Sequence, residues 1–211
     1  MNQVNLKSNG EEAMMLIFGT LGPAGSNHDW VAKRYLDFHG LPDAQIELFS
    51  DFDDAFDAMF QGRIHHVIQV AVHPSVTSTV ARYRGRAHLI DTFISPSQTM
   101  AVLTRSEVDT PSNLGLQMAT RDYIDASRWP TLVPEVSTVT VAEGLLAGRY
   151  DSGLTLLRIA EQYPDRFRVD EVIGTVDDPW LVYGRESTCQ GRVQAWPDSP
   201  AAALFRRQEP A

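Results

Sequence analysis

The sequence predicts an α/β protein with mainly parallel sheets, built as two lobes with a cleft between them. Two observations support this prediction. Short apolar runs alternate with segments of helical spacing along most of the chain, which is the pattern of strands joined by crossover helices. A proline break at 95–96 and a late return at 174–179 indicate that a second lobe is inserted into the first.

The lobe boundaries follow from these breaks. The first lobe is expected to comprise residues 13–95 and 175–186, and the inserted second lobe residues 96–174. The polar segment 1–12 and the proline-containing segment 187–211 are expected to be flexible tails. Because ligands of such sheets bind beyond the carboxyl ends of the strands, the cleft between the lobes is the expected site.

In the first lobe, apolar or alternating runs predict strands, and apolar spacings of three and four residues predict helices. The predicted strands are residues 14–18, 45–49, 66–72 and 87–94. The predicted helices are residues 30–38, 51–60 and 75–84. Phe52, Phe56 and Phe60 share one face of the second helix, so we expect them in the core, and Gly62 ends that helix.

The second lobe continues the alternation. Its predicted strands are residues 99–104, 114–119, 153–156 and 169–174, and a last strand at 180–183 returns to the first lobe. Its predicted helices are residues 121–128, 139–146 and 157–163. Pro130 and Pro164 stop the first and last of these helices, because the residue before a proline disfavours helical geometry.

Composition limits the function classes. The chain has 211 residues, of which 43% are hydrophobic, so a packed core is expected. A net charge of −9 without any basic run argues against nucleic acid and anionic membranes as partners. The single cysteine, Cys189, excludes an internal disulfide, and no signal peptide or membrane span is recognisable. We therefore expect a cytoplasmic protein.

The segment Leu-Gly-Pro-Ala-Gly-Ser-Asn-His at 21–28 lies between the first predicted strand and the first predicted helix. Gly22 and Gly25 permit backbone angles that other residues resist, and Ser26 or Asn27 is suited to cap the helix. Free N–H groups at the helix start, together with the positive end of its dipole, then favour an anionic ligand.

Further polar segments follow other predicted strands. They are His73 with Ser75, Thr120 with Arg121, and Ser137 with Thr138. With residues 25–28 they offer hydroxyl, imidazole and guanidinium groups beside backbone donors. The sequence therefore predicts a site for a small molecule carrying carboxylates, one of which Arg121 would clamp in bidentate fashion.

Simpler interpretations compete with these assignments. A histidine before a proline, such as His73, is more often a loop residue than a catalyst, and Ser or Thr at a helix start is mostly a cap. His65 and His66 point to opposite faces of a strand, and no cysteine, histidine or carboxylate cluster accompanies them, so we predict no metal. Trp180 is a typical packing residue, although its place at a lobe crossing would also suit a ligand wall. No nucleotide-binding glycine motif is present, and no cofactor is predicted.

Several of these segments resemble the catalytic domain of the prephenate dehydratase family. Residues 21–26 resemble the family's L-G-P-x-G-T opening, and Ser137-Thr138 followed by Ala142 resembles its S-T-x-x-A-A segment. Residues 148–155 resemble the next segment, which ends in a small or hydroxyl residue, here a threonine.

This likeness covers most of residues 15–186. It implies a type 2 periplasmic-binding-protein-like fold, in which two α/β lobes enclose the active site in a cleft. It agrees with the two lobes that the pattern of strands and helices predicts.

The departures from the family pattern bear on activity. Where dehydratases carry V-P-I-E-N-S, residues 70–75 read Val-Ala-Val-His-Pro-Ser, and residues 120–123 stand in place of S-H-P-Q. Asp178-Pro179-Trp180 replaces the Thr-Arg-Phe motif that carries dehydratase catalysis. The sequence also shows no regulatory ACT domain, so feedback by phenylalanine is not expected.

One branch of the family also lacks the Thr-Arg-Phe motif, namely the prephenate decarboxylases of bacilysin-type antibiotic pathways. Residues 180–184, Trp-Leu-Val-Tyr-Gly, resemble their tryptophan-containing segment. The resemblance therefore implies a lyase that removes carbon dioxide from prephenate, or from a related cyclic acid, without aromatising the ring. The alternatives are a non-catalytic ligand-binding or accessory protein, a lyase for another ring acid, as in tropolone-type pathways, and, less favoured, a true dehydratase.

A mechanistic hypothesis then assigns roles to individual residues, with His73, His28 and Arg121 as the predicted catalytic residues. The pyruvyl carboxylate would lie at Ser137-Thr138 and Arg121, the ring near Ser26, Asn27 and Trp180, and His73 or His28 would deliver the proton. The complete predicted substrate-binding set is Gly25, Ser26, Asn27, Ser75, Thr120, Ser137, Thr138, Thr155, Asp178 and Trp180. The family makes a homodimer plausible.

Overall fold

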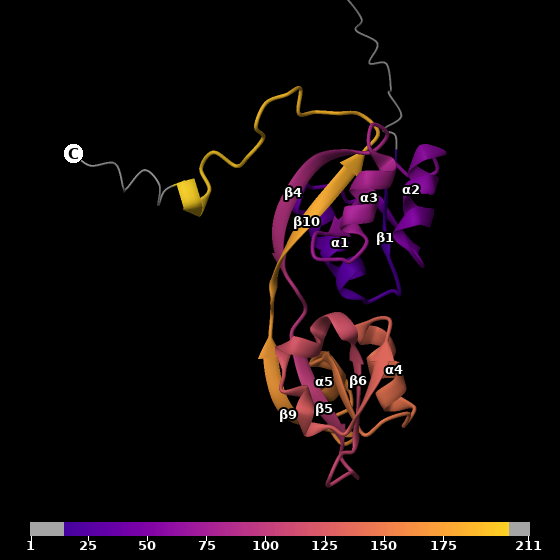
Figure 1. Cartoon of the computed structure of the whole chain (residues 1–211), viewed down its shortest axis with the longest axis vertical. Coiled ribbons are helices and arrows are strands. Elements are labelled where there is room, and N and C mark those ends of the chain that lie inside the picture. Colours follow the sequence, from indigo (N-terminus) through magenta and orange to yellow (C-terminus); the bar gives the residue numbers. More distant parts are fainter. Residues whose placement is uncertain (1–14, 203–211) are drawn as a thin grey trace, which may run out of the picture.

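The computed structural model describes residues 15–202, in which two five-stranded sheets form the centres of two lobes (Figure 1). The predicted tail at 1–12 lies outside the described residues, as does the start of the predicted strand at 14–18. The chain crosses between the lobes twice, along the same side of the molecule.

The first sheet has the strand order β2-β1-β3-β10-β4. Its strands are β1 Ile17–Leu21, β2 Gln45–Phe49, β3 His66–Val70, β4 His88–Pro96 and β10 Asp177–Gly184. The helices of this lobe are α1 Asn27–Phe38, α2 Phe52–Phe60 and α3 Val76–Tyr83. Asp51 caps α2, because its side chain accepts a hydrogen bond from the Asp54 N–H at 2.8 Å.

The second sheet has the strand order β7-β6-β8-β5-β9. Its strands are β5 Met100–Arg105, β6 Asn113–Gln117, β7 Thr131–Glu135, β8 Ser152–Leu156 and β9 Phe167–Gly174. Two α-helices, α4 Thr138–Leu146 and α5 Arg158–Gln162, and two 3₁₀ helices, η1 Met118–Tyr123 and η2 Ala126–Arg128, complete the lobe.

Each sheet contains one reversed strand. In the first sheet β10 runs antiparallel to β3 and β4, and in the second β5 runs antiparallel to β8 and β9, whereas the other neighbours are parallel. These are the strands that begin just after the chain has crossed from the other lobe, so they enter their sheets from the opposite end. The predicted two-lobed α/β fold is confirmed, whereas both sheets are mixed, with parallel and antiparallel pairings in each, because of this reversal.

Helices cover the sheet of the first lobe on both faces, and two apolar clusters result. One cluster packs α1 against the sheet and includes Phe18, Val31, Ile68 and Trp180. The other packs α2 and includes Phe52, Phe56, Ile64, Val67 and Tyr83, with Phe60 against it. The predicted phenylalanine stripe on α2 is therefore confirmed as core. Full burial of one such side chain contributes about 1.5–3 kcal/mol.

Two predictions about the second lobe are wrong. The expected helix at 121–128 is replaced by the 3₁₀ helices η1 and η2. Both are too short to present the apolar face by which an α-helix is recognised in a sequence. The strand β7 was not predicted, because its sequence Thr-Leu-Val-Pro-Glu contains a proline. β7 tolerates Pro134 because it lies at the edge of the sheet.

Candidate functional site

The start of α1 is organised mainly by its own side chains. Gly25 has a φ of 78°, in the left-handed region, and its N–H donates to the Asp29 carboxylate at 2.7 Å. Ser26 caps the helix by accepting from the Asp29 N–H at 3.3 Å. Within the described chain the N–H groups of Asn27 and His28 have no protein acceptor. Only these two N–H groups are therefore left for the predicted anion at the helix start, because the Asp29 carboxylate already accepts the Gly25 N–H.

His28, in the first turn of α1, lies in an aromatic cluster. Its ring centroid is 5.3 Å from that of Trp180, 5.8 Å from Phe52 and 6.2 Å from His73. Its Nε2 atom is buried, with no hydrogen-bond partner among the described residues. Burial and, secondarily, the charge of His73 lower the pKa of His28 to about 3. His28 is therefore neutral at pH 7.

His73 follows β3 and is held in one orientation by its neighbours. Its Nδ1 lies 2.7 Å from Ser75 Oγ and accepts the Ser75 N–H at 3.2 Å. Because Nδ1 is an acceptor, we assign the proton of the neutral ring to Nε2. The Phe52 ring packs edge-on at 5.0 Å. Burial lowers the pKa of His73 below its ordinary value.

Gln69 supports this arrangement and was missed from the sequence. It is fully buried on β3, and its Nε2 donates to Ser75 Oγ at 3.0 Å. Its Oε1 is buried without a partner in the described chain. The available signal was an amide in the middle of an otherwise apolar run, because buried polar groups are normally paired.

Trp180 lies in the core of the first lobe. Its side chain is 0% exposed and stacks on Phe93 at a centroid distance of 6.2 Å. It therefore packs in the core against the His28 ring, which is the packing role, and its role as a ligand wall stays a prediction. Asp178, two residues earlier, is half-buried, and burial followed by the neighbouring Asp177 raises the pKa of its carboxyl.

The predicted hydroxyl groups of the second lobe serve the fold. Ser137 and Thr140 form a capping box at the start of α4, in which Ser137 Oγ accepts from the Thr140 N–H at 3.1 Å. Thr155 Oγ1 donates to the Thr138 carbonyl at 2.5 Å, and both residues are buried. These side chains position α4 after β7, so a ligand would meet the backbone donors of the helix start.

Thr120 and Arg121 both lie in η1. Thr120 is buried, and its hydroxyl donates to the Gln117 carbonyl at 2.8 Å, which closes the first turn of η1. The Arg121 side chain is 52% exposed and pairs with Asp122 at 3.3 Å. Among the described residues, no hydrogen bond or ion pair joins Arg121 to another predicted site residue, so its role as a clamp stays a prediction.

Two residues that the sequence did not single out join the lobes. Gln98, between β4 and β5, donates its N–H to Asn27 Oδ1 at 3.0 Å and its Nε2 to the Gly25 carbonyl at 3.1 Å. Arg158, the first residue of α5, donates Nε to Gln98 Oε1 at 3.3 Å and Nη2 to the Gly25 carbonyl at 3.4 Å. The start of α1 is thus tied to the other lobe.

His65, which lies outside this cluster, serves the fold. His65 Nδ1 accepts the Ile17 N–H at 2.9 Å, which fixes the entry to β1. Among the described residues, no group of three or more histidine, cysteine or acidic side chains is arranged to hold a metal ion. No helix in the part of the chain that the structure describes has the length and apolar character needed to span a bilayer.

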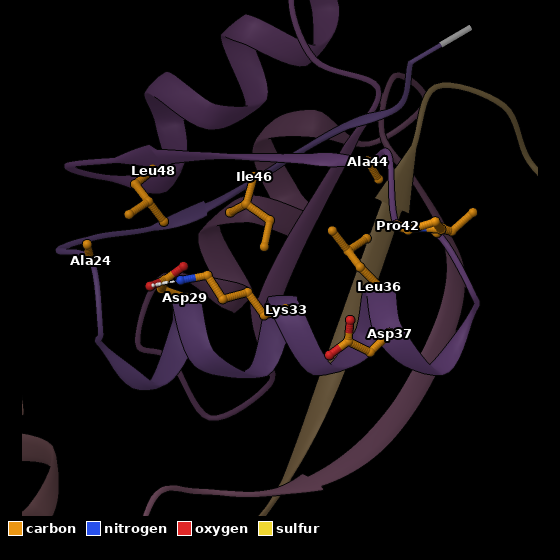
Figure 2. Close-up of a pocket in the computed structure, with 10 residues that line it drawn as sticks. Ala24, Asp29, Lys33, Leu36, Asp37, Pro42, Ala44, Ile46 and Leu48 are labelled. Carbon is orange, nitrogen blue, oxygen red and sulfur yellow. Dashed lines mark hydrogen bonds and ion pairs between the residues drawn. The ribbon is translucent and has the colours of Figure 1, made fainter. Parts of the chain in front are cut away.

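A separate cavity of about 400 Å³ lies between α1 and β2 (Figure 2). Leu36, Ile46 and Leu48 line it, and the Asp29–Lys33 ion pair of 2.8 Å spans one end. None of the predicted catalytic side chains lines this cavity. It is therefore distinct from the junction where His28 and His73 meet.

Comparison with known proteins places the fold. No family model and no curated protein matches the chain. The structure of prephenate dehydratase from Arthrobacter aurescens in complex with L-Phe has a TM-score of 0.61 at 19% identity, covering 90% of this chain and 70% of that one.

Two other solved structures show the same architecture. An ABC transporter protein from Parabacteroides distasonis has a TM-score of 0.54 at 14% identity, over 84% and 67% of the two chains. GqqA, described as a novel type of quorum quenching acylase, has a TM-score of 0.52 at 12% identity, over 82% and 65%. The protein has the predicted type 2 periplasmic-binding-protein-like fold and is prephenate dehydratase-like in structure. At these identities the likeness establishes the fold alone.

Proposed function

We propose that the protein is a cofactor-independent lyase of specialised metabolism, which decarboxylates prephenate or a related cyclic acid without aromatising its ring. The observation that carries the proposal is the pair His28 and His73. The two rings lie 6.2 Å apart beyond the ends of β1 and β3. Such an edge is where ligands of open α/β sheets bind. We also propose that the protein acts in the cytoplasm.

The two histidines differ in what they can contribute. His28 has a pKa of about 3, so it is not protonated to the cation at neutral pH and has no acidic proton to deliver. Burial also lowers the pKa of His73, whose Nε2 has no protein partner in the described chain. We therefore assign proton delivery to the cationic form of His73, whose Nδ1–H would then donate to Ser75 Oγ. Neutral His28 would bound the ring of the substrate.

The proposed step balances without a cofactor. The bond between the ring and its carboxylate carbon breaks, carbon dioxide leaves, and the electron pair passes into the diene. A proton from His73 then adds to a ring carbon. The 4-hydroxyl stays because no acid protonates it, which agrees with Asp178-Pro179-Trp180 standing where dehydratases carry Thr-Arg-Phe. Orientation and fixed dipoles would supply most of the acceleration.

The direct test is incubation of the pure protein with prephenate, followed by NMR of the products. The proposal expects a non-aromatic dihydro-hydroxyphenylpyruvate and carbon dioxide, with the rate strongly reduced in His73→Gln. His39→Gln is the matched control, because His39 lies at the C-terminal end of α1, whereas His28 lies in its first turn. Phenylpyruvate as the product would show a dehydratase instead, and unchanged prephenate would exclude both activities.

A second candidate is a binding or accessory protein without turnover. It is favoured by one observation, namely that the hydroxyl groups of Ser137 and Thr155 are engaged by the fold: Ser137 Oγ accepts the Thr140 N–H, and Thr155 Oγ1 donates to the Thr138 carbonyl. A ring acid that raises the melting temperature without being consumed would support this reading. In that case His73→Gln would change only the affinity for the ring acid, because there is no turnover to lose. A lyase for another ring acid would show turnover with that acid and none with prephenate.

A further inference from the structure

We infer that Arg158 is the carboxylate-binding residue between the lobes. The inference rests on the proposed function, in which the cleft takes a small ring acid. Arg158 comes from the second lobe, yet its guanidinium lies against Gly25 at the start of α1 in the first. No carboxylate of the described residues pairs with it within 4.0 Å.

The lack of an acidic partner sets Arg158 apart from comparable arginines. Arg105 and Arg168 are the other partly buried arginines of the second lobe, and each pairs with a carboxylate, Glu107 and Asp170, at 2.9 and 2.8 Å respectively. A partly buried cation normally acquires such a partner, because removing a charge from water is costly. Arg158 therefore retains a charge that the fold has not neutralised.

The present partners of Arg158 are weak and easily replaced. Both are neutral oxygens, Gln98 Oε1 at 3.3 Å from Nε and the Gly25 carbonyl at 3.4 Å from Nη2, beyond the usual range of N–H···O bonds. Nε and Nη2 form one edge of the guanidinium, and a carboxylate binds such an edge through two parallel hydrogen bonds. A ligand carboxylate would thus replace two long bonds by two charge-assisted ones.

The surroundings favour an anion at this edge. Gln98 Nε2 donates to the Gly25 carbonyl, so the amide presents only its Oε1 to Arg158, as an acceptor. A side chain at Gly25 would begin 3.2 Å from Arg158 Nη2, so glycine permits the close approach. Of the N–H groups that follow, that of Ser26 donates to the Pro23 carbonyl, whereas those of Asn27 and His28 have no acceptor within the described part. The guanidinium and these two donors therefore lie at the same end of α1.

This geometry defines the ligand class more narrowly. The acid should place one carboxylate on Arg158 of the second lobe while its ring reaches His28 and His73 of the first. A short chain between ring and carboxylate meets this need, and such a ligand would bridge the lobes. Arg121, which is exposed and paired with Asp122, would not be required.

The test uses 3-phenylpropanoate and its neutral isostere 3-phenylpropanamide as probes, with binding measured by calorimetry on the full chain. Wild type should prefer the acid. Arg158→Gln, which keeps a donor for the Gly25 carbonyl, should bind the acid about tenfold to hundredfold more weakly and lose the preference. The affinity of Arg158→Lys for the acid should lie between those of wild type and Arg158→Gln, because lysine keeps the positive charge but cannot bind a carboxylate through two parallel hydrogen bonds. The matched control is Arg84→Gln, which removes one charge at the exposed residue where α3 ends.

The outcomes separate this inference from the proposed function. Equal acid binding by wild type and Arg158→Gln, or no acid binding by wild type, overturns it. Melting temperatures without ligand should agree within a degree or two, so that an affinity loss cannot be attributed to unfolding. If wild type leaves prephenate unchanged but binds the acid through Arg158, only the proposed lyase fails. If prephenate is decarboxylated with the same KM in Arg158→Gln, only the role of Arg158 fails.

Discussion

Protonation of His28 should destabilise the native state as the pH falls below neutrality. The ring packs against Trp180 and Phe52, its Nε2 is buried without a partner, and its pKa falls from 6.5 to about 3. In the unfolded chain the same imidazole is in water and takes up a proton near pH 6.5. Between these two values the unfolded state binds a proton that the native state does not.

The sign and size follow from linkage. Because the unfolded chain binds more protons, the free energy of unfolding rises with pH across this window. The stability is complete above pH 6.5 and is lost progressively as the pH falls toward 3. Each pH unit below 6.5 costs about 1.4 kcal/mol, so at pH 5 His28 alone removes about 2 kcal/mol. That is a large share of a typical total of about 5–15 kcal/mol.

The comparison to make is wild type against His28→Phe, which replaces the ring by an aromatic one that cannot titrate. Urea unfolding at pH 5, 6 and 7.5 gives the free energy of unfolding for both proteins. The difference between them should shift by about 2 kcal/mol in favour of the variant on going from pH 7.5 to pH 5. Contributions common to both proteins, such as that of His73, largely cancel. Parallel pH profiles would refute the burial argument and with it the assignment of neutral His28.

Three further perturbations test the site and its support. If His73 delivers the proton, kcat/KM for prephenate should fall as the pH rises through a pKa below 6.5, and His73→Gln should lose this dependence. Gly25→Ala should cost about 1–2 kcal/mol through its φ of 78° and should weaken acid binding by displacing Arg158, measured by thermal denaturation and calorimetry. Trp180→Ala should destabilise the protein by about 3–5 kcal/mol in urea unfolding, because the side chain is fully buried; a loss below about 1 kcal/mol would contradict its place in the core.

The sequence predicted those elements whose signal is local. Buried apolar runs such as β3 and the phenylalanine stripe of α2 are dictated by spacing alone. β7 could not be predicted in this way, because Pro134 is unfavourable in a strand unless that strand lies at an edge, and edge position is a property of the whole sheet. The helix expected at 121–128 failed for a local reason, since Thr120 bonds the Gln117 carbonyl and Asp125 accepts the Ser127 N–H, and such short-range side-chain bonds compete with a continuous α-helix.

The candidate site was predictable to the extent that it depends on strand ends. His28, His73 and Ser75 follow β1 and β3, and the structure brings them together. The hydroxyl groups of the second lobe were over-interpreted, because a Ser or Thr that caps a helix looks the same in sequence as one that binds a ligand. Arg158 was missed because its partners lie 60 and 133 positions away in the chain. Its one local signal was a cation at the first residue of a helix, where the dipole disfavours it.

Charge provides the link between these residues and an acid ligand. With a net charge of −9 the protein repels an anion at long range, so affinity must come from donors at contact distance. Arg105 and Arg168 cannot supply it, because carboxylates of the fold already neutralise them. In the two proposals above, Arg158 supplies charge from the second lobe, whereas His73 supplies the proton from the first. On the proposed function neither lobe is competent alone, and the same acid that holds the lobes together brings its ring to the histidine that protonates it.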